Sequence, residues 1–407
     1  MSKRILISGA GVSGPTIAYW LARHGFDVTV IERAESLRLG GQNIDITDAA
    51  RDVIRMMGIE DAIRDRHTGE KGLQFVDRKG TARASYPVDK AGSLTREIEI
   101  LRGDLVEIIV EAGPETVDYR FGLSIEAVED EGDAVNVRFD DGTSDRFDLV
   151  IAADGMNSAT REMILDGKDH RKYLGCWSSY FTIPRLDRDN DWWRWYTSPT
   201  GVIAFLRPDN EGTMRASVNF LSDDDDPPHM SLDDKKKRLR ARLEGAGWEC
   251  ARIADALDGV DDIYLGPLHQ IKADRWSRGR LVLAGDAAHC PTPYTGMGTT
   301  LAIIGAYVLA NEIARHDDHE EALRAYEDVF RDFAERSQKL PPGVPDLAYA
   351  ESRLKVGLIN TGAMIGASGP VQSLISLFTG TGKDENDFVL PDYDASGSKD
   401  IARDRAA

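Results

Sequence analysis

The stretch that decides the fold is residues 3–14, KRILISGAGVSG, in which a short apolar run leads into glycines spaced as G-x-G-x-x-G. The apolar run predicts a buried parallel strand. Residues 15–25 open on proline and end on glycine, which predicts a helix. Residues 27–32, DVTVIE, predict a second strand. Together they predict a strand–helix–strand unit with a right-handed crossover, and therefore an α/β fold built on a parallel sheet.

In this context the glycine motif predicts a site for an adenine dinucleotide. Gly9 permits the tight turn, Gly11 lets a pyrophosphate approach the backbone, and Gly14 lets helix and strand pack closely. The backbone N–H groups at the start of the helix, including those of Val12 and Ser13, would face the phosphate charge.

Glu32 ends the second strand, where a carboxylate can accept the ribose hydroxyls of an adenosine. This carboxylate disfavours a 2′-phosphate on a nucleotide bound here. The glycine motif alone does not choose between NAD and FAD, and no second copy of it occurs in the chain.

The same buried strand pattern recurs at 148–154 and 280–286, so one parallel sheet is expected from three separated pieces of chain. Between them, a segment rich in aromatic residues and short alternating runs predicts an antiparallel sheet. The expected cofactor domain is discontinuous and the substrate domain is inserted into it. The boundaries are 1–72, 101–173 and 273–340 for the cofactor domain, 73–100 and 174–272 for the substrate domain, 341–380 for a bridging C-terminal helix, and 381–407 for a polar tail that frays.

Two distant motifs decide the cofactor: residues 154–161, DGMNSATR, and residues 285–298, GDAAHCPTPYTGMG. They resemble the D-G-x-x-S-x-x-R and G-D-A-A-H-x-x-x-P-x-x-G-x-G fingerprints of the class A FAD-dependent monooxygenases, the para-hydroxybenzoate hydroxylase superfamily. Within that superfamily the chain is most similar to the tetracycline-inactivating flavin monooxygenases. The resemblance covers nearly the whole chain and implies a Rossmann-type FAD-binding domain with an inserted antiparallel-sheet substrate domain and a C-terminal helix.

The residues of these motifs have a physical reading beside the resemblance. Asp286 directly follows a buried strand, placed to accept hydrogen bonds from the ribityl hydroxyls of FAD. The following helix would point its N-terminal amides at negative charge on the reduced flavin. By the resemblance, the two motifs contribute the cofactor residues Asp154, Asp286, Pro293, Gly296, Met297 and Gly298.

Two more segments match the family: residues 40–46, GGQNIDI, and residues 101–105, LRGDL. The resemblance implies that Asp45 lies near the flavin, that Arg102 contacts FAD, and that Arg33 stacks on adenine. A surface salt bridge is the alternative for each. Met297 stands where relatives carry glutamine. The backbone amides there can still face the flavin, but side-chain contacts to the flavin do not follow from the resemblance.

Two features of the sequence have two possible interpretations each. The sequence assigns no catalytic residue. His289 is either a general base or the residue that orders the turn of its motif. The tryptophans of residues 192–196 form either the core of a sheet or an aromatic wall of the substrate pocket.

The resemblance implies one FAD, reduced by NADPH or NADH that binds transiently. Reaction with O2 would give a C4a-hydroperoxide, whose terminal oxygen passes to an aromatic or polyketide-like small molecule. A reductase or dehydrogenase on the same fold, without oxygen insertion, is the alternative. A flavin-loaded protein that sequesters its ligand unchanged is the third possibility.

Composition limits the partners. The chain has 407 residues, with 69 acidic and 50 basic side chains and a net charge of −19, which argues against nucleic acid and anionic membrane surfaces. Its three cysteines form no C-x-x-C pair, so neither a disulfide framework nor a metal site is expected. The N-terminal apolar run is too short for a signal peptide. We expect a cytoplasmic monomer or dimer.

Residues 356–379 carry no charge, but contain Asn360, Gln372, Pro370 and four glycines. This polarity favours a helix packed on the protein over membrane association.

Overall fold

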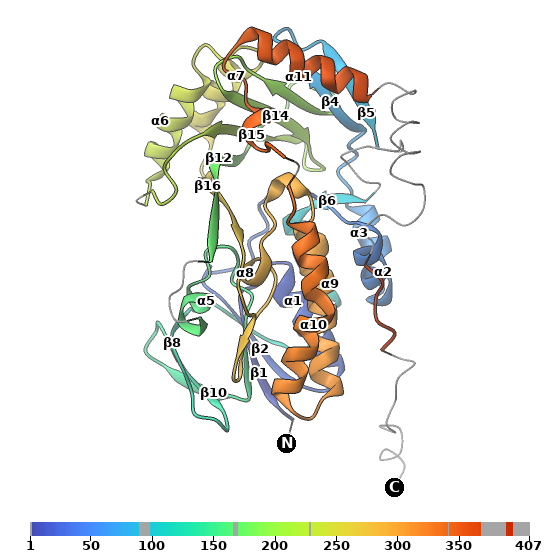
Figure 1. Ribbon diagram of the computed structural model, residues 1–407, viewed down its shortest axis with the longest axis vertical. Coiled ribbons are helices and arrows are strands. Elements are labelled where there is room, and N and C mark those ends of the chain that lie inside the picture. The colour runs from blue at the N-terminus through green and yellow to red at the C-terminus, as the bar shows by residue number, and fades with distance from the viewer. Residues whose placement is uncertain are drawn as a thin grey trace.

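The computed structural model describes residues 2–88, 98–165, 170–227, 229–340, 342–367 and 388–393. These residues form two sheet-based parts that lie one above the other in Figure 1. The long strand β12 (Arg171–Pro184) runs from the lower part into the upper one.

The lower part contains the predicted parallel sheet. Strand β1 pairs in parallel with β2 and with β11, and β11 pairs in parallel with β18, which confirms the strands expected from three separated segments. Strand β7 adds a further parallel edge that the sequence did not reveal. The sheet order is β17 (Ser277–Arg278), β18 (Leu281–Leu283), β11 (Leu149–Ala152), β1 (Arg4–Ser8), β2 (Asp27–Glu32) and β7 (Asp118–Phe121).

Helices surround this sheet, and the central one is α9 (Gly298–Arg315), whose residues 299–313 are all buried. It packs against α1, where the rings of Trp20 and Tyr307 lie 5.0 Å apart. The other helices of this part are α1 (Ser13–Arg23), α2 (Asp48–Met56), α3 (Glu60–Asp65), α4 (Arg102–Ala112), α5 (Ala159–Ile164), α8 (Asp286–His289) and α10 (His319–Ser337).

A small antiparallel sheet extends the lower part. It consists of β8 (Ile125–Asp130), β9 (Val135–Phe139) and β10 (Ser144–Phe147), in the order β10-β9-β8. Strands β9 and β10 form an antiparallel hairpin, and Asp141 and Gly142 lie in its turn.

The upper part is a seven-stranded sheet, which confirms the antiparallel insert. All its neighbours are antiparallel except the parallel pair β13–β4. Helices α6 (Leu232–Leu243) and α7 (Cys250–Ala256) cover one face over a core that contains Trp177 and Phe220. The order is β16 (Tyr264–Ile271), β12, β15 (Thr213–Leu221), β14 (Val202–Pro208), β13 (Trp193–Thr197), β4 (Gly72–Val76) and β5 (Ala82–Pro87).

A two-stranded ribbon lies at the junction of the two parts. Strand β6 (Glu99–Leu101) pairs with β3 (Asn43–Asp45), so residues 99 and 100 differ from their expected place in the inserted domain. Asn43 Nδ2 donates to the carbonyl oxygen of Pro208 in β14, at 2.8 Å, and so ties the ribbon to the upper sheet.

The C-terminal region contains the expected helix, α11 (Arg353–Gly366), which contacts β5. Tyr86 Oη donates to the carbonyl oxygen of Ala363 at 2.6 Å. Its bridging role stays a prediction, because its described contacts are with the upper sheet.

Residues 388–393 lie on the lower part, so the prediction that the tail frays is wrong for this segment. The rings of Phe388 and Phe333 lie 5.0 Å apart, and Tyr393 Oη donates to Glu312 at 2.7 Å. Phe388, Leu390 and Tyr393 are partly buried against the core of the lower part, which holds the segment in place although Val389 is exposed.

No helix within the described ranges is long and apolar enough to cross a membrane. Residues 368–379 of the uncharged stretch lie outside those ranges.

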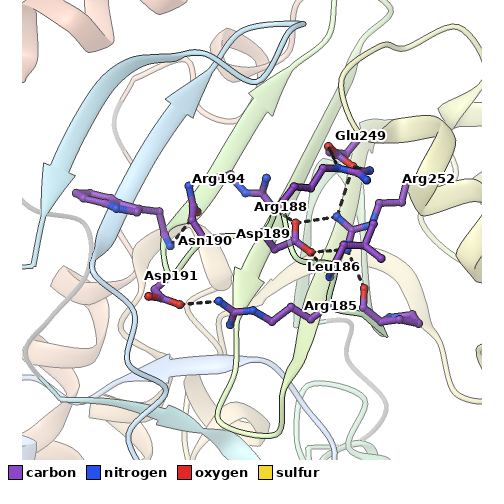
Figure 2. A network of polar contacts seen from close by, with 11 residues as sticks. Arg185, Leu186, Arg188, Asp189, Asn190, Asp191, Arg194, Glu249 and Arg252 are labelled. Carbon is purple, nitrogen blue, oxygen red and sulfur yellow. Dashed lines mark hydrogen bonds and ion pairs between the residues drawn. The ribbon is translucent and has the colours of Figure 1, made fainter.

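A network of arginines and carboxylates anchors the loop before β13 (Figure 2). Asp189, which is fully buried, accepts from Arg252 at 2.6 and 2.8 Å, from Arg194, and from the N–H of Leu186 at 2.8 Å. Desolvation opposes its charge, but the bonds from Arg252, Leu186 and Arg194 outweigh it and lower the pKa of Asp189 to about 2. The charge on this carboxylate is therefore stabilised by the fold.

The variant Asp189→Asn is expected to lower the free energy of unfolding by about 3 kcal/mol at neutral pH, because it leaves two buried guanidinium groups short of a counter-charge. Asp191→Asn is the matched control, since Asp191 is 39% exposed and its ion pairs with Lys71 and Arg185 should contribute under about 1 kcal/mol. Urea unfolding of the two variants checks this; equal losses would contradict it.

Candidate functional site

The glycine turn after β1 lies against both of the other motifs. A Cβ at Gly9, whose φ is +108°, would lie 2.5 Å from the carbonyl oxygen of Ala153 and 2.9 Å from Cα of Asp154. A Cβ at Gly285 would lie 2.9 Å from Cβ of Ser13. Three motifs that are far apart in the sequence therefore meet at the carboxyl ends of β1, β11 and β18.

The start of α1 fits a pyrophosphate. A Cβ at Gly14 would lie 1.9 Å from the carbonyl oxygen of Gly9, whereas a Cβ at Gly11 would have no atom within 4 Å. No side chain caps the helix at Val12, and its first turn holds no acidic residue. Ser13 Oγ is buried without a hydrogen-bond partner among the described residues. Free amides, open space above Gly11 and an unpaired hydroxyl match the needs of a bound phosphate.

Glu32 lies at the end of β2, beside this turn. Its Oε2 accepts from the N–H of Ala10 at 3.1 Å, and its Oε1 accepts from the N–H of Ala34 at 3.0 Å. These bonds fix the carboxylate and leave lone pairs for ribose hydroxyls. Arg33 is exposed next to it, and its stacking on adenine stays a prediction.

Arg102 begins α4 and lies between Glu32 and Asp286. Its Nη2 donates to the carbonyl oxygens of Arg38, at 3.3 Å, and Gly40, at 3.2 Å. Burial and the charge of Arg38 lower the pKa of Arg102, against the opposing charges of Glu32 and Asp286. Arg102 is a desolvated cation held by a loop, and no carboxylate of the described residues lies within 4.0 Å of its guanidinium group, so it is suited to bind an anionic ligand.

Asp286 is the exposed residue of α8, at the end of β18. Desolvation raises the pKa of its carboxyl to about 6, although a hydrogen bond with Cys290 and the charge of Arg102 lower it. The side chain is nevertheless exposed, while its neighbours in α8 are buried. A carboxyl group that is partly desolvated and still exposed can contact a bound ligand.

Asp154 holds its own turn together. Its carboxylate accepts from Ser158 Oγ, and from Thr160 Oγ1 at 2.9 Å. The buried Arg161 donates to the carbonyl oxygens of Met156, at 3.0 Å, and Ala287, at 3.3 Å. The motif thus ties the end of β11 to α8, and a direct contact between Asp154 and the cofactor stays a prediction.

The start of α9 has free backbone amides. Pro293 opens a short 3-10 turn (Pro293–Thr295), Gly296 and Met297 follow it, and Gly298 is the first helical residue, with no side-chain cap. The N–H groups of this first turn would face a ligand.

Asp45 ends strand β3, and the chain that follows it is held next to α9. The hydroxyl groups of Thr47 and Thr300 form a hydrogen bond of 2.7 Å. Asp45 itself is half-buried and lies opposite Glu99 in the β3–β6 ribbon.

His289 is not placed to act as a general base. Its ring is buried beside Trp276, at 4.9 Å, and Phe330, at 5.3 Å, and neither ring nitrogen has a hydrogen-bond partner among the described residues. Burial lowers its pKa to about 3, so the ring is neutral at physiological pH. This supports the interpretation that it orders its turn.

A row of half-buried aromatic rings lines the face of the upper sheet that α6 and α7 leave uncovered. The rings of Trp195 lie 5.4 Å from Phe205 and 5.5 Å from Trp193. Trp195 and Phe205 belong to the same cluster as Tyr294, which lies in the third flavin motif. The tryptophan segment therefore fits the pocket-wall interpretation. We call this surface the aromatic wall, formed by Phe75, Tyr86, Trp193, Trp195 and Phe205.

A buried ionic group lies beside the wall, on the same face of the sheet, and the sequence did not reveal it. Arg207 packs 4.3 Å from the ring centroid of Trp193 and forms ion pairs with Glu70, at 3.0 Å, and Glu99, at 2.6 Å. All three side chains are buried. We call these three residues the Arg207 cluster. The sequence does contain a sign of this cluster, because two apolar runs each include a charged residue. Glu99 lies within residues 98–101, and Arg207 ends residues 202–207.

Comparison with known proteins agrees with this geometry. A family model described as FAD binding domain matches residues 3–339. An uncharacterised protein of Mycobacterium tuberculosis is 35% identical over 353 residues, which cover 84% of this chain and 95% of that protein. The flavin-dependent monooxygenase eupH of a Phoma species is 36% identical and covers 98% of this chain and 99% of its own. The crystal structure of the tetracycline destructase Tet(51) has a TM-score of 0.80 at 29% identity, covering 97% of this chain and 100% of that chain.

Proposed function

This chain belongs to the FAD-binding-domain family of class A flavin-dependent monooxygenases, and from this premise we propose that it hydroxylates an aromatic or polyketide-like small molecule, with NADPH or NADH as reductant and O2 as the second substrate. The observation that carries the substrate class is the aromatic wall, of which Trp195 and Phe205 pack against the same buried cluster as Tyr294 of the third flavin motif. Flat rings stack on such a surface with little loss of conformational entropy.

The residues present fit FAD. The start of α1 and the open space at Gly11 would take the pyrophosphate, Glu32 the adenosine ribose, and Asp286 the ribityl chain. Arg102 would supply positive charge between the last two. Bound FAD supplies the redox chemistry and the activation of oxygen.

The protein's own share is binding, orientation and the control of charge. The free amides at Gly298 and the next residues of α9 would stabilise negative charge on the flavin ring. The aromatic wall would hold the substrate and exclude water from the reacting atoms.

The variant Trp195→Ala is expected to raise the KM for substrate about tenfold or more, because loss of one stacking ring costs about 1–3 kcal/mol of binding. FAD content should not change, since Trp195 lies outside the three flavin motifs. Oxygen consumption by FAD-loaded protein, with NADPH and NADH and a panel of planar aromatic and aliphatic compounds, measures this.

Trp248→Ala is the control, because Trp248 contacts Tyr196 in the core under α6 and α7, at 5.6 Å between ring centroids. It should lose stability without changing the KM. No substrate-dependent oxygen consumption by wild-type protein with any aromatic compound would remove the proposed substrate class.

We also infer a reducing compartment, as in the cytoplasm. All three cysteines, Cys176, Cys250 and Cys290, are free and buried.

A further inference from the structure

The Arg207 cluster holds more carboxylates than one guanidinium can balance. Arg207 Nε and Nη2 donate to Glu70 at 3.0 and 3.2 Å, and Nη2 also donates to Glu99 at 2.6 Å. Asp45 lies opposite Glu99 across the β3–β6 ribbon. Among the described residues, Arg207 is the cation that pairs with the two buried glutamates, and the charge of Asp45 also acts on it.

Among the described residues, the other side chains that bond Glu99 are polar and neutral, and the phenol of Tyr180 also lies within reach of the charge of Arg207. Thr68 Oγ1 donates to Glu99 Oε2 at 2.9 Å, and the side chain of Asn43 also bonds Glu99. Desolvation and the nearby carboxylates outweigh Arg207, so the pKa of Glu99 rises to about 7 and that of Glu70 rises well above its usual range. The lower-energy arrangement is one in which a proton neutralises the excess charge.

The proposed reaction consumes one proton per turnover. Its balance is substrate C–H + O2 + NAD(P)H + H⁺, giving substrate C–OH + NAD(P)⁺ + H2O. One oxygen atom leaves as water, so the protein must deliver that proton inside a site that excludes bulk solvent.

We propose that Glu70 and Glu99, held by Arg207 beside the aromatic wall, share one proton at neutral pH and supply it to the pocket once per turnover. The proposal rests on the proposed function. The carboxylic O–H bond breaks, the proton ends in the product water, and a proton from solvent restores the pair. Arg207 lies 4.3 Å from the ring centroid of Trp193, which places the pair next to the aromatic wall.

Infrared spectroscopy of FAD-loaded protein detects the shared proton directly. Wild-type protein should show a protonated-carboxyl band that disappears as the pH rises from about 5 to about 9, centred near neutral pH, where an ordinary glutamate has long been ionised. The band should be lost in Glu99→Gln, and in Glu70→Gln if the first variant does not fold. Glu126→Gln, an exposed carboxylate paired with Arg138, should retain it.

A second measurement, of enzyme kinetics, distinguishes a role of Glu99 in proton supply from a purely structural role. Glu99→Gln should bind FAD and substrate normally but lose about tenfold in kcat, and its rate should no longer change with pH around neutrality. A KM increase with unchanged kcat would instead indicate a merely structural role and overturn the inference.

The shared proton and the proposed monooxygenase function can be disproved by different results. Absence of a band that titrates near neutral pH, or its persistence in both glutamine variants, overturns the shared proton whatever the activity. A normal band in a protein that hydroxylates nothing overturns the proposed function, and with it the delivery step.

Discussion

Replacing Gly11 by alanine is expected to weaken FAD binding at least about 100-fold, or roughly 3 kcal/mol, while leaving the protein without FAD as stable as the wild type. The protein alone has room for the methyl group, because a Cβ at this position meets no atom within 4 Å. A pyrophosphate bound over the turn needs the same space. Fluorescence titration of FAD and thermal unfolding of the cofactor-free protein measure the two quantities.

Two other glycine variants serve as comparisons for Gly11→Ala. Gly14→Ala should lose both FAD binding and stability, since its methyl group would meet the carbonyl oxygen of Gly9 at 1.9 Å. Gly357→Ala in α11 should change neither, because its Cβ also meets nothing within 4 Å and it lies far from the glycine turn in sequence and in the fold (Figure 1). Unchanged FAD affinity in Gly11→Ala would mean that the phosphate does not lie on this turn.

Replacing Arg207 by alanine is expected to lower the free energy of unfolding by about 3–5 kcal/mol at pH 8, because it leaves two buried carboxylates without their cation. The loss should be smaller near pH 6. The pKa values of Glu70 and Glu99 are already raised and would rise further without Arg207, so protonation can then neutralise both groups. Urea unfolding at the two pH values measures the difference.

Arg138→Ala is the control for this variant. Arg138 pairs with Glu126 on the surface, where both side chains are more than half exposed, so its removal should cost under about 1 kcal/mol at either pH. A loss in Arg207→Ala that is no larger than this, or one that grows as the pH falls, would contradict the electrostatic account of the cluster.

The cofactor part of the fold could be predicted from the sequence because its signals are local. Residues 3–14 carry a strand, a turn and a helix start within one short segment, and each of the other two motifs directly follows a buried strand. Their convergence follows from parallel strands, whose carboxyl ends meet at one edge of the sheet. The contacts of Gly9 with Ala153 and of Gly285 with Ser13 show this edge.

The Arg207 cluster could not be predicted, because its members come from three segments whose pairing depends on the whole fold. Glu99 is on β6, Arg207 is on β14, and Glu70 precedes β4. Each alone is typical of a surface residue. Only the register of the β3–β6 ribbon and of the upper sheet brings them together.

Strand β7 and the packing of residues 388–393 were also not predicted, because their sequences give weak local signals. Strand β7 has only four residues, two of them charged, so it lacks the apolar run of a central parallel strand. Phe388 and Tyr393 were missed because a polar composition hides a few anchoring side chains.

The measurement that tests the central claim most directly is oxygen-isotope labelling. FAD-loaded protein is supplied with NAD(P)H, an aromatic substrate that stimulates oxygen consumption, and ¹⁸O2, and the product is analysed by mass spectrometry. A monooxygenase incorporates one labelled oxygen atom into each product molecule and releases the other as water. Product formed without the label, or NAD(P)H oxidised with no oxygen in the product, would contradict the account and favour a reductase or dehydrogenase on the same fold.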